Sequence, residues 1–463
     1  MDTRIERDFL GEVAVPSEAY WGAQTQRALE LYAISGRRSS PDLAHAIALI
    51  KRAAARTFRE LGLLDPMQAQ AIDDAAKEVQ EGRWDEQIVV DVFQAGAGTS
   101  LHMNLNELIA NRANELLGSK LGSYSPIHPN DQVNMGQSTN DVFPTAMRLA
   151  ALEQLSGLDQ ALDRVEKSLR SKASAFDSIL KAGRTHLQDA VPIRLGQEFG
   201  AYASTIARSR RALLANLDAL SELGLGGTAV GTGLNTPVAY RTRVVEELRH
   251  LTGHHGLHAT HDYFETMQSM VPFTMLSSTL RNLAIELNRI ANDLRLLSSG
   301  PRTGLHEIVL PAVQPGSSIM PGKLNPSIPE MLNQVCFQVL GNDAAIAGAS
   351  QAGQLELNVM MPVIAENLLF SLRILRTSLQ VFAKRCLEGI EVDAVRCKAN
   401  AENSVALATV LNPLIGYSQA AEVTKEALKR NEPIPRIIWA KGLLSEEQLA
   451  KVFEPRHLTE PSA

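Results

Sequence analysis

Leucine and isoleucine residues that recur every three or four positions constrain this 463-residue chain to a helical fold. Between residues 276 and 297 the spacing follows a heptad pattern for three repeats, which predicts one long helix with a narrow apolar seam. The same spacing predicts long helices over 155–169, 195–220 and 357–379. A further helix is expected around Pro329, because proline suits a first helical turn.

The composition agrees with helices packed on helices. The chain is 45% hydrophobic but only 5% aromatic, a balance that favours helices over a sandwich or barrel. Helices of about thirty residues would span about 45 Å, and a chain of this size rarely covers such a length on every side. We therefore expect a bundle that completes its core by pairing with other subunits. The mild net charge of −6 gives no basic face for nucleic acid.

The regions before and after the long helices have shorter patterns. Short extended pieces are expected before residue 40, and Asp42 is expected to cap the first helix. Helices are predicted over 42–59, 66–81 and 101–117, and after Asp393 over 402–410, 418–429 and 445–452, with a ragged tail after Glu454. The changes in helix length along the sequence predict a mainly α chain with three domains. These are a mixed, mostly helical domain over 1–138, a central long-helix domain over 139–393 and a small C-terminal helical domain over 394–463.

Three cysteines bear on the cellular compartment. Cys336, Cys386 and Cys397 are isolated and odd in number, which favours a reducing compartment. The N-terminus is charged from the start and lacks the apolar core of a signal peptide. Because the sequence also holds no apolar run long enough to span a membrane, we expect a soluble, cytoplasmic protein.

Four loops, each beside a predicted long helix, are rich in glycine and small polar side chains. They comprise residues 96–100, 137–141, 183–189 and 316–325. Any one of them could be an ordinary helix cap. Four such loops in one chain favour a site for a small polyanion, because hydroxyls, amides and loop N–H groups are carboxylate donors. Lys323 would supply the positive charge, and His186 is the best candidate for a titrating group.

Two other motifs are set aside. The segment 316–323 resembles a phosphate-binding loop, but it is one residue too long and has Pro321 where the glycine belongs. A histidine cluster between 254 and 261 has spacings that could bind zinc. Gly253 and Gly256 interrupt the helix there, so we do not expect a metal site.

The segment 316–325, GSSIMPGKLN, resembles the signature GSSxMPxKxN of the aspartase/fumarase superfamily. The resemblance covers nearly the whole chain, and three segments are more similar to aspartate ammonia-lyases than to fumarases. Residues 96–100 read Gly-Ala-Gly-Thr-Ser where fumarases usually have Gly-Ser-Gly-Thr-Gln, and residues 137–141 read Gln-Ser-Thr-Asn-Asp where fumarases usually have Ser-Ser-Asn-Asp. The third segment is 292–302. The resemblance implies a homotetramer with a central twenty-helix bundle, five helices from each subunit, and active sites shared by three subunits.

The resemblance also implies a reaction, the reversible deamination of L-aspartate to fumarate and ammonia. It would proceed by anti β-elimination through an aci-carboxylate, with Ser317 as base, His186 as a second catalytic residue, Glu330 in support, and no metal or cofactor. The residues that would bind the small dicarboxylate substrate are Thr99, Ser138, Thr139, Asn140, Thr185, Ser318, Lys323 and Asn325.

Three alternatives stay open at this stage. Fumarate hydratase would use the same fold and pocket with a different leaving group. A related lyase of N-substituted aspartates is also compatible with the residues. A catalytically silent structural protein on the same scaffold is the alternative of a different class, and the retained Ser317, Lys323, Asn325 and His186 argue against it.

Overall fold

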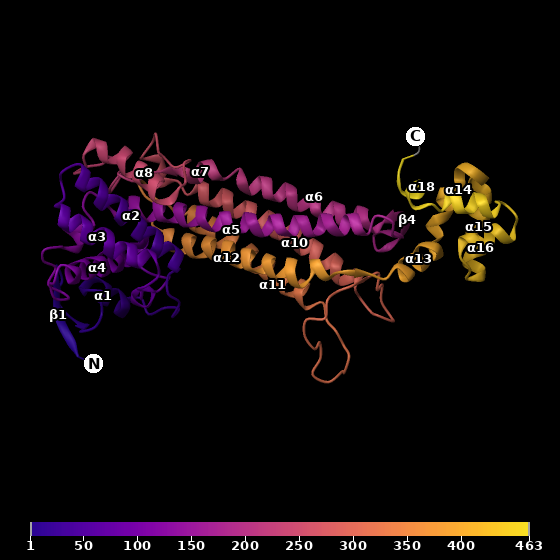
Figure 1. Cartoon of the computed structure of the whole chain (residues 1–463), viewed down its shortest axis with the longest axis horizontal. Coiled ribbons are helices and arrows are strands. Elements are labelled where there is room, and N and C mark those ends of the chain that lie inside the picture. Colours follow the sequence, from indigo (N-terminus) through magenta and orange to yellow (C-terminus); the bar gives the residue numbers. More distant parts are fainter. Residues whose placement is uncertain (1, 462–463) are drawn as a thin grey trace. The chain divides into compact units, whose positions relative to one another are not determined.

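A computed structural model describes residues 2–461, and Figure 1 shows the order of their elements. The chain divides into two compact units made of alternating segments. Unit 1 comprises Met1–Leu158, Ala212–Asn282 and Gln338–Ile374, and unit 2 comprises Asp159–Arg211, Leu283–Phe337 and Leu375–Ala463. The divisions fall inside the long helices, so each long helix contributes one part to each unit.

Five long helices confirm the mainly α prediction. They are α5 (Thr139–Ala175), α6 (Leu195–Leu214), α10 (Val271–Leu297), α11 (Ser327–Ser350) and α12 (Met361–Arg385). The seam leucines of α10 are buried, as the heptad pattern predicted. The predicted helix over 195–220 is too long, because α6 ends at Leu214. There the Asn216 side chain donates to the Ala212 carbonyl at 2.9 Å, and α7 (Leu217–Ser221) begins separately.

Unit 1 is built on a group of N-terminal helices. Its elements before the first long helix are β1 (Thr3–Asp8), β2 (Gly11–Pro16), α1 (Ala23–Leu31), α2 (Pro41–Glu60), α3 (Pro66–Gln80) and α4 (Thr99–Leu116). Later elements are β5 (Glu222–Leu223), α8 (Val238–Thr252), β6 (His258–Ala259) and α9 (Glu265–Gln268). The first two strands form an antiparallel hairpin. Asp42 is not the N-cap of α2: the helix begins at Pro41, and Asp42 lies in its first turn.

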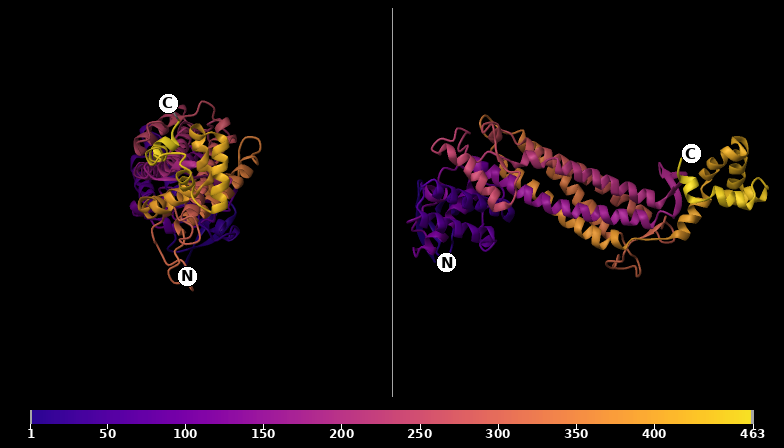
Figure 2. Two further views of the ribbon diagram at one scale, coloured as in Figure 1. Left: turned by 90° about the vertical axis from the view of Figure 1, so that its right-hand side faces the viewer. Right: turned by 45° about the horizontal axis from the view of Figure 1, so that its top comes forward.

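Unit 2 contains one hairpin near the end of the long helices. Its strands β3 (Leu180–Thr185) and β4 (Gln188–Arg194) pair antiparallel, with an irregularity between Ala182 and Arg184. The short strands β7 (Ile308–Val309) and β8 (Glu391–Val392) also pair antiparallel. Within this unit the parts of the long helices run side by side (Figure 2), and Tyr202 of α6 donates to Asp293 of α10 at 3.1 Å.

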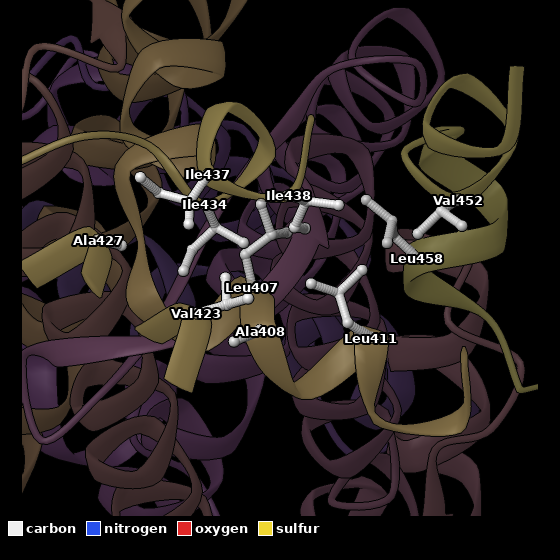
Figure 3. Packing of buried hydrophobic residues seen from close by; sticks show 10 residues of the cluster. All are labelled: Leu407, Ala408, Leu411, Val423, Ala427, Ile434, Ile437, Ile438, Val452 and Leu458. Carbon is white, nitrogen blue, oxygen red and sulfur yellow. The ribbon is translucent and has the colours of Figure 1, made fainter. Parts of the chain in front are cut away.

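The C-terminal helices of unit 2 that follow α13 (Ala394–Asn403) share a small core of their own. They are α14 (Ala408–Ile415), α15 (Tyr417–Arg430), α16 (Ile434–Ala440), α17 (Glu446–Val452) and α18 (Pro455–Thr459). Figure 3 shows ten buried residues of this core, among them Leu407, Leu411 and Ile437. The predicted helix over 402–410 is wrong, because Ser404 adopts an extended backbone that separates α13 from α14. The tail after Glu454 is also more regular than expected, since it forms α18.

The proposed three-domain division remains a prediction, and its outermost residues, 1 and 462–463, lie outside the described part of the chain. Across residues 2–461, no helix combines the length and the apolar character that a membrane crossing requires.

Candidate active site

The central loop, residues 314–326, is closed at its base by two hydrogen bonds. The Gly316 N–H donates to the Lys323 carbonyl at 2.9 Å, and the Asn325 side-chain amide donates to the Gly316 carbonyl at 2.7 Å. A Cβ at Gly316 would lie 2.4 Å from the Lys323 carbonyl oxygen, so only glycine permits this approach. The loop has no regular secondary structure, but these two hydrogen bonds hold its two ends together.

Ser317 lies just inside this closure and is half-buried. Its Oγ accepts the backbone N–H groups of Ile319 at 3.2 Å and Met320 at 3.0 Å. Local turns of this kind are common for serine. Two N–H dipoles aimed at one hydroxyl oxygen also favour negative charge on that oxygen, which is what a serine base would need.

The other predicted residues of the loop lie close to Ser317 in sequence and differ in exposure. Ser318 and Lys323 are exposed, and Asn325 is half-buried. The Lys323 ammonium donates to the Asn325 side-chain oxygen at 2.9 Å, so these two residues form one polar group. Glu330 lies in the first turn of α11. Within residues 2–461, no side-chain hydrogen bond or ion pair joins Glu330 to the loop.

Thr185 and His186 lie at the tip of the β3–β4 hairpin, where both side chains are exposed. His186 and Leu187 form the two-residue turn with φ angles of 55° and 59°. Such left-handed turns match the strand twist but are strained for residues other than glycine or asparagine. Strain of this kind often accompanies a functional position. Among the described residues, no hydrogen bond or ion pair joins this turn to the central loop.

An ion-pair cluster fixes the hairpin below its tip. Glu307, which is fully buried, pairs with Arg184 at 2.7 Å and with Lys181 at 3.1 Å, and it accepts from Asn400 at 3.0 Å. Burial raises the pKa of Glu307, but the Arg184 and Asn400 hydrogen bonds and the Lys181 charge more than offset this and leave the pKa lowered. Sequence reasoning missed Glu307, because nothing in its local sequence marks an acid that will be buried.

The predicted donors of unit 1 lie at two helix starts. Thr99 is the exposed first residue of α4, preceded by Gly98 at φ 86°. A Cβ at Gly98 would lie 2.1 Å from the Phe143 ring, so this turn requires glycine. Ser138 immediately precedes α5, and its Oγ accepts the Asn140 N–H at 3.2 Å. The Asn140 side-chain amide donates to a backbone carbonyl at 2.8 Å, which leaves its side-chain oxygen as the open group.

Thr139 and Asp141 connect this segment to buried side chains. The Thr139 hydroxyl lies 2.7 Å from His102 Nδ1. Asp141 accepts the backbone N–H groups of Ser138 at 2.9 Å, Gly226 at 2.9 Å and Thr228 at 3.0 Å. Burial raises the pKa of Asp141 to about 6, although these hydrogen bonds and the charge of Lys51 act against the rise. Sequence reasoning missed both Lys51 and His102, because neither residue has a local sequence pattern that marks it as buried.

The predicted residues therefore fall into two sets. Thr99, Ser138, Thr139 and Asn140 belong to unit 1, and the other seven belong to unit 2. An apolar cavity of about 480 Å³ lies elsewhere in unit 2 beside α13, and none of the predicted residues lines it. Between residues 2 and 461, no three His, Cys, Asp or Glu side chains are grouped to hold a metal ion, and this includes the histidines from 254 to 261.

Comparisons with known proteins give the family. A family model described as "Lyase" matches residues 11–341, and one described as "Fumarase C C-terminus" matches residues 407–460. An aspartate ammonia-lyase from Bacillus sp is 48% identical over 99% of this chain and 98% of its own length. A class II fumarate hydratase from Thermosynechococcus vestitus is also 48% identical, over 96% of each chain.

A solved structure extends the match to the fold. The crystal structure of a fumarate lyase:delta crystallin from Brucella melitensis, bound to cobalt, superposes with a TM-score of 0.95. Its sequence is 47% identical, and the match covers 99% of this chain and 100% of that chain. The chain thus belongs to the lyase family of the aspartase/fumarase superfamily, whose members include aspartate ammonia-lyases and class II fumarate hydratases.

Proposed function

We propose that this protein is a carbon–nitrogen lyase that deaminates L-aspartate reversibly to fumarate and ammonia. The observation that carries the proposal is the Ser317 hydroxyl, which accepts two backbone N–H groups within a loop that also presents Lys323. The choice of aspartate over malate rests on the sequences of residues 96–100 and 137–141, which resemble those of aspartate ammonia-lyases.

The difficult step of this reaction is removal of a proton from the carbon beside the β-carboxylate. That carbon is a very weak acid, and the aci-carboxylate dianion that results needs donors already in place where the charge develops. The residues that would supply them are Thr99, Ser138, Thr139 and Ser318. Collapse of the dianion then breaks the C–N bond, and the electron pair leaves with ammonia. Because the leaving group starts as an ammonium, no strong general acid is required.

Ser317 would take the proton as an alkoxide. The N–H groups of Ile319 and Met320 favour negative charge on its Oγ, and exclusion of water around the bound substrate would strengthen that effect. Lys323 and Asn325 would hold the α-carboxylate, while Thr185, His186 and Asn140 would border that carboxylate and the amino group. Glu330 would support His186. The scheme uses no metal or cofactor.

We further propose a homotetramer with active sites shared by three subunits. Large apolar side chains stay exposed along the long helices of the single chain, with Phe337 at 61%, Met275 at 50% and Ile285 at 47%. Such side chains are expected to be covered by other subunits. The three cysteines are free and buried, which agrees with a protein of the reducing cytoplasm.

The proposal is tested by incubating the purified protein with L-aspartate and, separately, with L-malate, and by following fumarate in the ultraviolet. Fumarate from aspartate alone, with ammonia released in equal amount, supports the ammonia-lyase. Fumarate from malate alone identifies a fumarate hydratase instead. Release of fumarate only from N-substituted aspartates identifies a related lyase, and no turnover of any of them would favour a structural protein.

A further inference from the structure

Lys51 of α2 is fully buried, and its ammonium group faces three acceptors. Its Nζ lies 2.7 Å from His102 Nε2, 2.9 Å from the Asn134 side-chain oxygen and 2.9 Å from the Gln137 side-chain oxygen. A lysine ammonium has three N–H donors and no acceptor. Three donors and three acceptors therefore match, provided that each partner presents a lone pair.

The two amide side chains are oriented by other bonds. The Gln137 NH₂ donates to the Val133 carbonyl at 3.2 Å and to the Met135 carbonyl at 3.1 Å. The Asn134 NH₂ donates to the Gln137 carbonyl at 3.4 Å. Both side-chain oxygens are consequently left to face Lys51, and the third donor of the ammonium is left for His102.

This arrangement determines where the His102 proton lies. If Nε2 accepts from Lys51, a neutral imidazole carries its proton on Nδ1. Nδ1 then donates to the Thr139 hydroxyl oxygen, 2.7 Å away. Because the Thr139 oxygen already accepts a proton from His102, the Thr139 hydroxyl proton is free to be donated to another group.

We infer that Lys51 and His102 are positioning residues that keep the Thr139 hydroxyl available as a donor to the substrate carboxylate. The donor direction runs from Lys51 through His102 to Thr139 and out to the ligand. The last contact rests on the proposed function, whereas the proton position on His102 does not.

The hydrogen-bond geometry favours an ammonium at Lys51, because all three of its partners present an acceptor. Burial acts in the opposite direction and lowers the pKa of Lys51 well below its usual value, although the charge of Asp141 raises it. Burial and the neighbouring Lys51 charge lower the pKa of His102, which keeps the imidazole neutral. A neutral Lys51 amine would instead offer a lone pair to His102 Nε2–H. Thr139 would then donate inward to Nδ1 and would be lost as a donor to substrate.

The direct test is the protonation of His102 in the resting protein. The protein is labelled with ¹⁵N-histidine, and the ring nitrogens are identified by their long-range couplings to the ring protons. The His102→Gln variant assigns the resonances. A neutral ring with its proton on Nδ1 is expected at neutral pH, and a proton on Nε2 would overturn the inference. This result does not depend on which substrate the enzyme uses.

A double-mutant cycle tests the functional consequence. Thr139→Val and Lys51→Met should each lower kcat/KM for L-aspartate by about 10²–10³-fold, the usual effect of losing one donor to a developing oxyanion. If Lys51 acts through Thr139, the double variant is no worse than Thr139→Val alone, whereas a general structural role would make the losses multiply. Thr139→Ser, which keeps the hydroxyl, should retain most of the activity.

Fumarate binding separates the two proposals. Fumarate is a ligand of an ammonia-lyase and of a hydratase alike, so its Kd is measured by calorimetry for the wild type and the same variants. The positioning role is supported, even if aspartate is not turned over, when Lys51→Met binds fumarate more weakly and the double variant binds it no more weakly than Thr139→Val. Wild-type affinity for fumarate in both single variants would overturn the positioning role.

Discussion

Arg184 meets Glu307 through two contacts of 2.7 and 3.0 Å, directly below the turn that carries His186. The Glu307 carboxylate is fully buried, and the side chain of its second partner, Lys181, is 3% exposed. Water therefore compensates neither of these two charges. A two-point guanidinium–carboxylate contact also fixes direction, because both groups are planar. The pair therefore anchors the strand that leads into the strained turn.

Glu307→Gln is expected to destabilise the protein strongly and to lower activity through misplacement of His186. Removing one partner of a buried ion pair typically costs about 3–5 kcal/mol, because it leaves an uncompensated buried charge. Glu388→Gln is the matched control: its partner Arg164 is 47% exposed, and such surface pairs contribute about 1 kcal/mol or less. Chemical denaturation of the three proteins measures the difference; equal stabilities for both variants would contradict the anchoring role.

Ser317→Ala is expected to abolish turnover of the substrate while fumarate still binds, because the variant loses the base but keeps the carboxylate donors. Initial rates and calorimetric fumarate affinity measure the two effects separately. Ser204→Ala is the control, since that exposed hydroxyl donates to the Gly200 carbonyl of its own helix. Near-normal turnover of Ser317→Ala would remove Ser317 from the base role.

Lys323→Gln is expected to raise KM sharply, because the ammonium that pairs with Asn325 is proposed to hold the α-carboxylate. Charge-assisted hydrogen bonds typically contribute about 1.5–3 kcal/mol, which corresponds to a rise of about tenfold to a hundredfold. Steady-state kinetics measure KM for both proteins. The exposed Lys425 of α15 provides the control substitution Lys425→Gln, and an unchanged KM in both variants would assign Lys323 to the solvated surface.

Asp141 is expected to make stability depend on pH in an unusual direction. Burial raises its pKa to about 6, above the ordinary value of about 3.9 for an aspartate, so the folded state binds more protons than the unfolded state between these values. The contribution of Asp141 to the free energy of unfolding is therefore present at low pH and is lost as the pH rises through about 6. Between pH 4.5 and 7 the loss is about 2 kcal/mol by linkage.

Comparison with Asp141→Asn isolates this contribution from the other carboxylates. The variant cannot ionise at this position, so the stability of the wild type relative to the variant should decrease from pH 4.5 to pH 7. Thermal midpoints of both proteins at the two pH values measure the trend. A difference that grows toward pH 7 would show that the Asp141 pKa is lowered in the folded protein.

Phe337→Asp is expected to weaken the tetramer, because this ring is 61% exposed in the single chain and lies on a long helix. Sedimentation velocity should show a tetramer for the wild type and smaller species for the variant. Leu428→Asp, at a side chain that is 65% exposed on the C-terminal helix α15, should leave the assembly intact. An active wild-type monomer would contradict sites shared between subunits.

Much of the helical architecture could be predicted from sequence because its signals are local. The heptad leucines of α10 and the proline- and glycine-rich segment 314–326 report helix and loop without knowledge of any distant residue. Errors arose where a single residue interrupts the helical backbone. The Asn216 side chain bonds to the Ala212 carbonyl just after the end of α6, and the extended backbone of Ser404 separates two helices that the apolar pattern alone had joined.

The sequence by itself determined the long helices, the central loop and the residues of the superfamily signature, because each depends on neighbouring positions or on a contiguous motif. Only the tertiary structure decided which charges are buried. Lys51, His102 and Glu307 have ordinary sequence surroundings, and their roles arise from partners 37 to 126 positions away, such as Thr139 for His102 and Lys181 for Glu307. Burial and pairing of charges depend on long-range packing, which no local pattern encodes.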